Sequence, residues 1–335
     1  QTAYYAKLLK DDIGLGIDIL ADILQNSTFE EEELERERSV ILQEIGQAAD
    51  TPDDIIFDHF QATAYPGQAL GRPVLGTADI VGKMTRNTVI KFITDNYGGG
   101  QMVFSAAGNV DHEDLVDRVQ LQFSSLPQKA VSKIEPANYL GGDWRQYKDL
   151  EQVHLILGFP AATFYDPDFY AQQVLSMLLG GGMSSRLFQE VREKRGLVYS
   201  IYSFTSAYRD SGMLGIYAGT GEREIQELIP VVCEELLTII DCDLDSEVQR
   251  SKTQLRSGLL MSRETNSNRC EQMAQHLLVH GQIMTVSEII EKVDAVDTDS
   301  VRRVAKKIIA TKPTLTALGP ISNLESYQKL CDRLR

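Results

Sequence analysis

The sequence predicts an α+β protein of two homologous domains, each an antiparallel β-sheet packed with α-helices. Three observations support this prediction. The chain has 335 residues, more than one ordinary domain requires. Short apolar runs with strand character alternate with longer segments of helical period. Similar segments also recur, as an internal duplication would produce.

The first half of the chain opens with a segment of strand character and continues mainly as helices. Asp11 or Asp12 can cap the first helix, whose apolar positions follow a helical period. A turn is expected at Tyr65-Pro66-Gly67, and glycines break the chain at 98–100. We expect strands at 2–9 and 101–107, and helices at 13–24, 28–47, 55–64, 85–96 and 111–123.

The second half is expected to form a more complete sheet. Apolar periodicity fades between residues 124 and 147, where prolines and a glycine pair occur. We therefore place a linker at 129–147, between an N-terminal domain at 1–128 and a C-terminal domain at 148–335. We expect strands at 153–159, 197–204, 212–219 and 314–318, and helices at 169–179, at 184–194 and over most of 222–309.

The duplication is most visible around two glycines. The segment around Gly108 and the helix before it resemble the segment around Gly319 and its preceding helix, 211 residues later. The glutamate-rich helix at 28–47 aligns in the same way with residues 245–260. One α+β unit, present twice, accounts for both matches.

Helix 28–47 carries the first candidate site residues. Thr28 and Glu31 form a capping-box pattern, and glutamates fill the first turn. Glu37 and Glu44 are seven residues apart, so both carboxylates project from one face, beside an apolar stripe. Solvated charges would explain this spacing equally well. The second copy, however, has Ser251 and Gly258 at these positions, and this asymmetry favours a functional role.

Composition excludes some classes of partner. The net charge of −15 and a pI near 4.8 argue against nucleic acid and anionic membranes. Four scattered cysteines without CxxC spacing indicate free thiols in a reducing compartment. No apolar run approaches a membrane span, and no signal-peptide pattern opens the chain.

Two further motifs have competing interpretations. The stretch from Gly180 to Tyr199 could be a flexible loop between helices. Its Arg192 and Tyr199, on either side of a helix-to-strand turn, would also suit two donors converging on an oxyanion. His276 and His280 have the spacing of a helical zinc pair, but Leu277 stands where HExxH requires glutamate, so ordinary helix positions are favoured.

Several motifs together resemble the pitrilysin (M16) family of zinc metallopeptidases, and most closely its processing-peptidase β subunits and their bacterial homologues. The resemblance covers essentially the whole chain. The motifs that carry it are ERERSVILQE at 35–44, FDHF at 57–60, YPGQALGRPVLGT at 65–77 and SRLFQEVREKRGLVY at 185–199.

The resemblance implies a zinc site and a mechanism. In that family an inverted H-x-x-E-H helix supplies two histidine ligands and a general base that activates the zinc-bound water. Glu44 matches the distant third ligand, and Glu37 a supporting acid. Arg192 and Tyr199 match the pair that reaches toward the scissile carbonyl. The implied function is zinc metalloendopeptidase cleavage of peptides or presequences in an interdomain chamber.

The sequence also departs from the family, because H-x-x-E-H occurs nowhere in it. We therefore expect an N-terminally truncated, inactive form that binds Zn²⁺ weakly or not at all. The alternative is a catalytically silent structural or substrate-binding subunit. The resemblance further implies a homodimer or a heterodimer with a related subunit, in the bacterial cytoplasm or, alternatively, the mitochondrial matrix.

Overall fold

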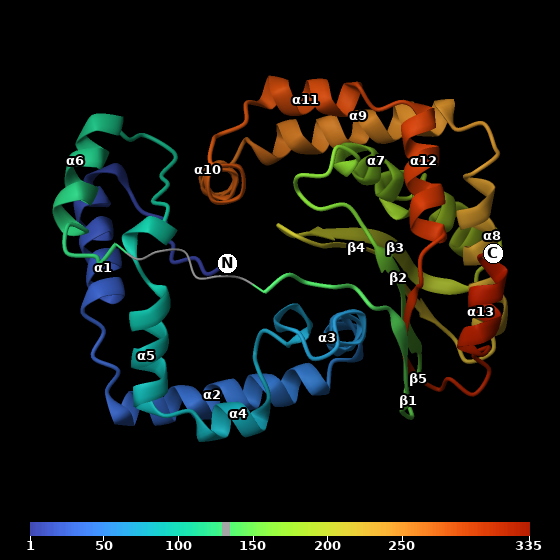
Figure 1. Cartoon of the computed structure of the whole chain (residues 1–335), viewed down its shortest axis with the longest axis horizontal. Coiled ribbons are helices and arrows are strands. Elements are labelled where there is room, and N and C mark those ends of the chain that lie inside the picture. Colours follow the sequence, from blue (N-terminus) through green and yellow to red (C-terminus); the bar gives the residue numbers. More distant parts are fainter. Residues whose placement is uncertain (129–134) are drawn as a thin grey trace. The chain divides into compact units, whose positions relative to one another are not determined.

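The computed structural model describes residues 1–128 and 135–335 and shows a mixed helical and sheet protein (Figure 1). The α+β class predicted from the sequence is confirmed. Contacts divide the chain into two compact units. Unit 1 contains Gln1–Gln43, Ala78–Ile134 and Leu259–Thr285, and unit 2 contains Glu44–Thr77, Glu135–Gly258 and Val286–Arg335.

Most of the expected helices are present. Those of the first half are α1 (Ile13–Gln25), α2 (Glu31–Ala49), α3 (Pro52–Ala64), α4 (Ala78–Lys83), α5 (Arg86–Asn96) and α6 (His112–Gln122). Those of the second half are α7 (Phe169–Gly180), α8 (Ile225–Thr238), α9 (Asp245–Ser262), α10 (Asn266–His280), α11 (Val286–Asp294), α12 (Thr298–Ile309) and α13 (Tyr327–Arg333). In the described parts of the chain, no helix is long and apolar enough to cross a membrane.

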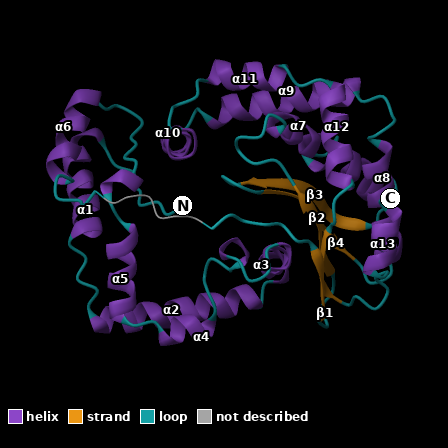
Figure 2. Cartoon of the chain, viewed as in Figure 1, coloured by secondary structure: helices purple, strands orange, loops and turns teal. Residues whose placement is uncertain are grey.

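A five-stranded sheet organises unit 2 (Figure 2). Its strands are β1 (Gly142–Tyr147), β2 (Val153–Pro160), β3 (Val198–Ala207), β4 (Gly212–Thr220) and β5 (Thr314–Gly319), in the order β1-β5-β2-β4-β3. The pairings of β2, β3, β4 and β5 are antiparallel as predicted, whereas β1 joins β5 in parallel. The central strands are buried on both faces, which explains their nearly continuous apolar runs.

Alternating side chains of these strands form two hydrophobic clusters. Leu155 and Leu157 of β2 belong to the larger cluster, which includes residues of α7, α8 and α12. Ile156 belongs to the smaller cluster with Ile56 and Phe60 of α3. Phe60 is fully buried, a contribution of about 1.5–3 kcal/mol for a side chain of this size. Helix α3 is therefore fixed on the sheet.

Two predicted strands are not strands in the structure. Residues 2–9 and 102–107 form no strand pairing, and Gln101 ends a short 3-10 helix. Their duplicates are β4 and β5, which lie between neighbours in the sheet of unit 2. The strand character of both pairs is alike, but a strand also needs a partner for its backbone groups, and none of the described residues supplies one in unit 1.

The predicted linker at 129–147 is partly wrong, because residues 142–147 form β1. Gly141, with φ +64°, lies just before β1, where the chain turns into the sheet. The next residue, Gly142, donates its backbone N–H to Pro313 O. Residues 129–134 lie outside the described part. Each compact unit is made of three separate segments, whereas the predicted domains at 1–128 and 148–335 are contiguous. The division into two duplicated halves stays a prediction.

The start of the glutamate helix differs by three residues from the prediction. Helix α2 begins at Glu31, and Thr28 does not cap it. Phe29 has a positive φ of 49°, and the Arg86 guanidinium donates to the backbone oxygens of Thr28 and Phe29. This contact from α5 fixes the loop in a conformation that a local capping box does not allow.

Candidate active site

Arg192 is positioned by an unusual helical segment. Phe188–Glu193 forms one turn of π-helix, in which Lys194 N donates to Gln189 O at 3.0 Å. Buried Val191 holds this segment against the core. Single π-turns are rare and occur frequently at functional sites. The π-turn that carries Arg192 is therefore a feature that the residue types alone did not predict.

The turn after this segment depends on Gly196, which has φ +64°. Gly196 N donates to Arg192 O at 3.1 Å, and Leu197 N donates to Val191 O at 3.0 Å. The first of these is the 5→1 bond of the αL motif, which ends many helices at a left-handed glycine. Since Leu197 and Val198 are buried, the chain enters β3 in a fixed orientation.

Tyr199 lies at a β-bulge near the start of β3. Val198 pairs with Thr220 and Ser200 pairs with Gly219, so Tyr199 is the extra residue. Its side chain is 76% exposed. Bulges re-aim a side chain and are common beside active sites. The bulge explains how Tyr199 projects to solvent between buried Val198 and half-buried Ser200.

The structure brings Arg192 and Tyr199 together, as their placement around one turn predicts. The guanidinium carbon of Arg192 lies 5.9 Å from the centre of the Tyr199 ring and 4.7 Å from that of Phe188. The Arg192 side chain is 36% exposed, and its nearest carboxylate, Glu193, is 3.8 Å away. Both the guanidinium and the phenol can donate hydrogen bonds to one oxygen. Phe188 was not predicted as a site residue, although it lies four residues before Arg192, a spacing at which two side chains of a helix make contact.

Glu37 and Glu44 both lie on α2 and both are exposed. Half-buried Leu34, Ile41 and Ile45 lie on the same helix, consistent with the predicted apolar stripe. Neither carboxylate forms an ion pair or hydrogen bond with any residue that the structure describes. By contrast, Arg36 and Arg38 bind other glutamates of α2.

No zinc site is formed by the described residues alone. They contain no group of three or more histidine, cysteine, aspartate or glutamate side chains able to hold a metal ion. His276 and His280 are 6.1 Å apart between ring centres, and His276 Nδ1 accepts from Met284 N. A lone exposed carboxylate such as Glu44 is a poor zinc site without imidazole or thiolate ligands. The residues present therefore do not fit the metal by themselves.

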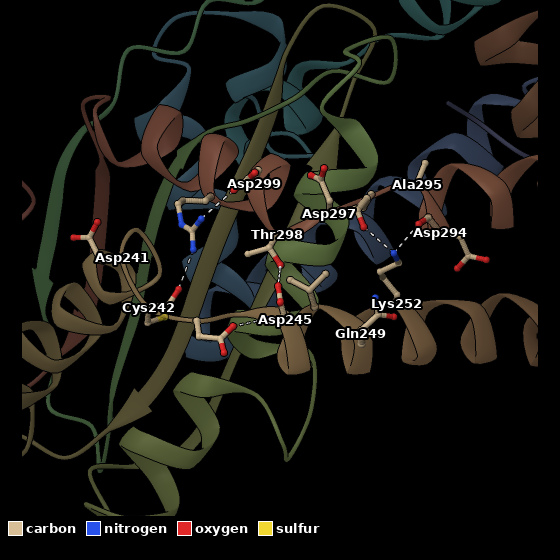
Figure 3. A pocket seen from close by; sticks show the side chains of 14 residues that line it. Asp241, Cys242, Asp245, Gln249, Lys252, Asp294, Ala295, Asp297, Thr298 and Asp299 are labelled. Carbon is tan, nitrogen blue, oxygen red and sulfur yellow. Dashed lines mark hydrogen bonds and ion pairs between the residues drawn. The ribbon is translucent and has the colours of Figure 1, made fainter.

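A groove lies elsewhere in unit 2 (Figure 3). It has a volume of about 930 Å³ and follows the starts of α9 and α12. Aspartates dominate its lining, including Asp243, Asp245, Asp297 and Asp299. Lys252 is buried at its edge and donates to two backbone oxygens. None of the predicted site residues lines this groove.

A second polar cluster lies on the α3 side of the sheet. His154 Nδ1 and the Tyr217 hydroxyl are 2.9 Å apart, and Tyr202 stacks on Tyr217 with ring centres 5.0 Å apart. Burial lowers the pKa of His154 and raises the pKa of Tyr217 to about 12. The sequence carried no signal for this cluster, since its members are distant in the chain and meet only through strand register.

The structure is that of an α+β protein with an exposed Arg–Tyr pair, and comparison with known proteins defines its family. Residues 1–78 match the model of "Insulinase (Peptidase family M16)", and residues 83–255 match that of "Peptidase M16 inactive domain". The chain belongs to peptidase family M16. The predicted resemblance is confirmed.

Similar proteins include a named zinc protease, a processing-peptidase subunit and a chain of a complex III structure. An uncharacterised zinc protease of Rickettsia felis is 39% identical over 96% of this chain and 78% of the relative. The mitochondrial-processing peptidase β subunit of Mus musculus is 33% identical over 100% of this chain and 71% of its own length. A chain of complex III from Candida albicans shares the fold, with a TM-score of 0.89 and 19% identity over 98% of this chain and 81% of that chain.

Proposed function

We propose that this protein takes part in zinc-dependent hydrolysis of peptide bonds, as an endopeptidase acting on peptides or presequences. Arg192 and Tyr199 donate hydrogen bonds to the oxygen of the scissile carbonyl as it becomes an oxyanion. Two donors in place before reaction stabilise this charge without reorganisation. The proximity of these two side chains at one turn, on a π-helix and a β-bulge, is the observation that supports the proposal.

Glu44 is assigned as one zinc ligand and Glu37 as an acid that supports it. This assignment rests on the family motif and on the absence of both acids from the duplicated helix α9, which has Ser251 and Gly258 instead. Zinc supplies the Lewis acid in such peptidases. Since H-x-x-E-H does not occur in these residues, the 335-residue chain alone is expected to bind zinc weakly and to be inactive.

Zinc content tests the assignment of Glu44. Elemental analysis of the 335-residue chain should give far less than one zinc per chain. In a longer form that carries an H-x-x-E-H helix, Glu44→Gln should abolish zinc retention and peptide cleavage. Glu32→Gln, an exposed glutamate of the same helix that pairs with Arg36, is the control and should change neither. Undiminished zinc and activity in Glu44→Gln would disprove the assignment.

Association with a related chain is part of the proposal. Relatives include β subunits of processing peptidases and a chain of a multi-subunit complex, by their names. We propose a homodimer or a heterodimer with a second M16 chain, located in the bacterial cytoplasm or, alternatively, the mitochondrial matrix. Light scattering after size-exclusion chromatography distinguishes a monomer from a dimer, and a monomer with every related chain tested would contradict the proposal.

A catalytically silent structural or substrate-binding subunit is the second candidate. The lack of a metal-binding group among the described residues favours it. Retention of Glu37, Glu44, Arg192 and Tyr199 argues against it, because a silent subunit has no chemical need for them. Peptide binding without cleavage, in a form that carries H-x-x-E-H and bound zinc, would establish this alternative.

A further inference from the structure

Arg186 lies six residues before Arg192, at the start of the segment that carries it. Its guanidinium binds both carboxylate oxygens of Glu247 in α9, through Nε at 2.8 Å and Nη2 at 2.6 Å. Nη2 also donates to Cys242 Sγ at 3.0 Å, and Nη1 lies 3.6 Å from Glu235 Oε2 of α8. One side chain of unit 2 therefore joins this segment to two helices and to the loop between them.

The contacts of Arg186 are shielded from solvent. The side chains of Arg186, Glu235 and Glu247 are 14%, 15% and 17% exposed. Partly buried ion pairs are screened by salt much less than surface pairs, and a bidentate guanidinium–carboxylate pair fixes orientation as well as distance. Arg195 also ties the segment to α8, through Glu227, but these two side chains are 40% and 57% exposed. Arg186 is therefore the stronger attachment.

Electrostatics make Arg186 necessary to its two acids. Burial is the main cause that raises the pKa of Glu235, and the charge of Arg186 opposes this rise. Burial also acts to lower the pKa of Arg186, but the hydrogen bond and charge of Glu247 outweigh it, so the pKa is raised. Without the guanidinium, two half-buried carboxylates would lose their shared counterion.

The segment that Arg186 attaches is the π-turn of the site. Leu187 and Val191 are fully buried, and Gln189 N donates to Ser185 O at 3.0 Å where the helical segment begins. Consecutive side chains of a helix are about 100° apart around its axis, so a slip of one residue would turn Arg192 away from its present direction. The place where the segment starts therefore determines where Arg192 projects.

This network belongs to the second copy of the duplication. In α1, Ile23 stands at the position that Glu235 has in α8. In α2, Glu33 stands at the position of Glu247 and pairs with Arg36 of its own helix at 2.7 Å. The three-way pairing is thus confined to the copy that carries Arg192 and Tyr199, which favours a role in the site over a role in the common fold.

We propose that Arg186 is a positioning residue for the Arg192–Tyr199 pair. Through its bonds to Glu247 and Cys242 it holds the π-turn in the register that directs both donors toward one oxygen. Arg186 acts through the pair and is assigned no contact with substrate. The identity of the oxygen rests on the proposed function, whereas the hold on the turn requires neither zinc nor catalysis.

Hydrogen–deuterium exchange of the 335-residue chain tests this hold. Arg186→Lys keeps the charge, but a single ammonium group cannot replace the planar fork of the guanidinium. We expect the amides of Lys194, Gly196 and Leu197, which close the turn, to exchange about tenfold faster. Arg195→Lys is the matched control on the same segment, and it should change these rates by less than about twofold.

Two further variants separate a local hold from general stability. Glu247→Gln removes the charged partner at nearly constant volume and should accelerate the same amides, so it decides the question if Arg186→Lys does not fold. Lys252→Met removes a buried cation from the same helix without touching the segment. Equal acceleration in Lys252→Met would overturn the proposal, as would unchanged exchange in both Arg186→Lys and Glu247→Gln.

A zinc-loaded form that contains H-x-x-E-H tests the consequence for catalysis. Arg186→Lys should lower kcat about tenfold and leave KM and zinc content unchanged. In an Arg192→Ala background the same change should cost about twofold or less, because the donor that it positions is absent. Fully additive losses would overturn the proposal. If Arg192→Ala itself left turnover intact, the proposed function would fail, and the exchange rates would still decide whether Arg186 holds the turn.

Discussion

Lys252 is a buried ammonium group, 7% exposed, whose hydrogen bonds go to the backbone oxygens of Asp294 and Val296 at 2.6 and 2.7 Å. In the first copy, Arg38 occupies the same position of the glutamate helix and donates to Val81 O at 2.6 Å. A cation that ties the helix to backbone oxygens of a later segment in both copies is structural. Glu37, next to Arg38, has no such counterpart, and this contrast supports a functional role for it.

Lys252→Met should lower the free energy of unfolding by about 2–4 kcal/mol, because it leaves two buried carbonyl oxygens without their charged donor. Urea denaturation followed by circular dichroism measures this. Lys306→Met, an exposed change in α12, is the control and should shift stability by less than about 0.5 kcal/mol. Equal stability of the two variants would show that water satisfies these oxygens.

Arg192→Ala should lower turnover of a zinc-loaded, H-x-x-E-H-containing form by about 10²-fold, because one donor to the oxyanion is lost. Metal content should not change, since the guanidinium is not a ligand. Arg195→Ala, three residues later, removes an exposed arginine that pairs with Glu227 and should leave turnover intact. Loss of zinc in Arg192→Ala would contradict the assigned role, and steady-state kinetics with elemental analysis distinguish the outcomes.

At the scale of elements, the two copies show which features a sequence pattern determines. Helices α1, α2 and α5 recur as α8, α9 and α12, and all were predictable from apolar period and caps. Strand character was equally readable in residues 2–9 and in β4. Strand pairing could not be predicted, because a strand depends on neighbours that can lie anywhere in the chain. The π-turn before Gly196 could not be predicted either, because it leaves no trace in the composition.

Gly108 and Gly319 occupy the same place in the two copies and have nearly the same φ, +136° and +132°. A side chain is strained at either position. At Gly319 an added Cβ would also lie 2.5 Å from the backbone oxygen of Gln152, whereas at Gly108 its nearest neighbour is the Asn266 amide at 3.1 Å. The backbone cannot move aside as a surface side chain can.

We therefore expect Gly319→Ala to destabilise the protein by about 3 kcal/mol or more, and Gly108→Ala by about 1–2 kcal/mol. Chemical denaturation compares the two variants directly. A larger loss for Gly108→Ala would mean that Asn266, rather than the sheet, is the less adaptable neighbour. The matched φ values make this pair a test of packing alone.

At the scale of the whole molecule, each compact unit contains a segment from the other half of the sequence. Residues 44–77, with α3, belong to unit 2, and residues 259–285, with α10, belong to unit 1. Since α3 and α10 follow the duplicated helices α2 and α9, the exchange is reciprocal. A linear reading predicts contiguous domains, because composition shows where periodicity fades but not which partner a helix packs against.

Acidification should reduce the stability of the chain through its half-buried histidines. Burial lowers the pKa of His59, His154 and His276 below the value of about 6.5 expected in the unfolded chain. At pH values between the folded and unfolded pKa of these histidines, the unfolded state binds more protons than the folded state. The contribution of the neutral imidazoles to the free energy of unfolding is therefore present above about pH 6.5 and is lost as the pH falls through the window between the two pKa values. Asp58 and Glu235, whose pKa values are raised, act in the opposite direction.

The free energy of unfolding in urea should therefore be lower at about pH 5.5 than at about pH 7.5, on either side of the histidine window. His154→Gln keeps an acceptor for the Tyr217 hydroxyl but removes the titrating ring, so its pH dependence should be weaker than that of the native chain. His112→Gln, exposed at the start of α6, should retain the native dependence. If His154→Gln and His112→Gln respond alike, the dependence arises from other groups and the imidazole of β2 is not its source.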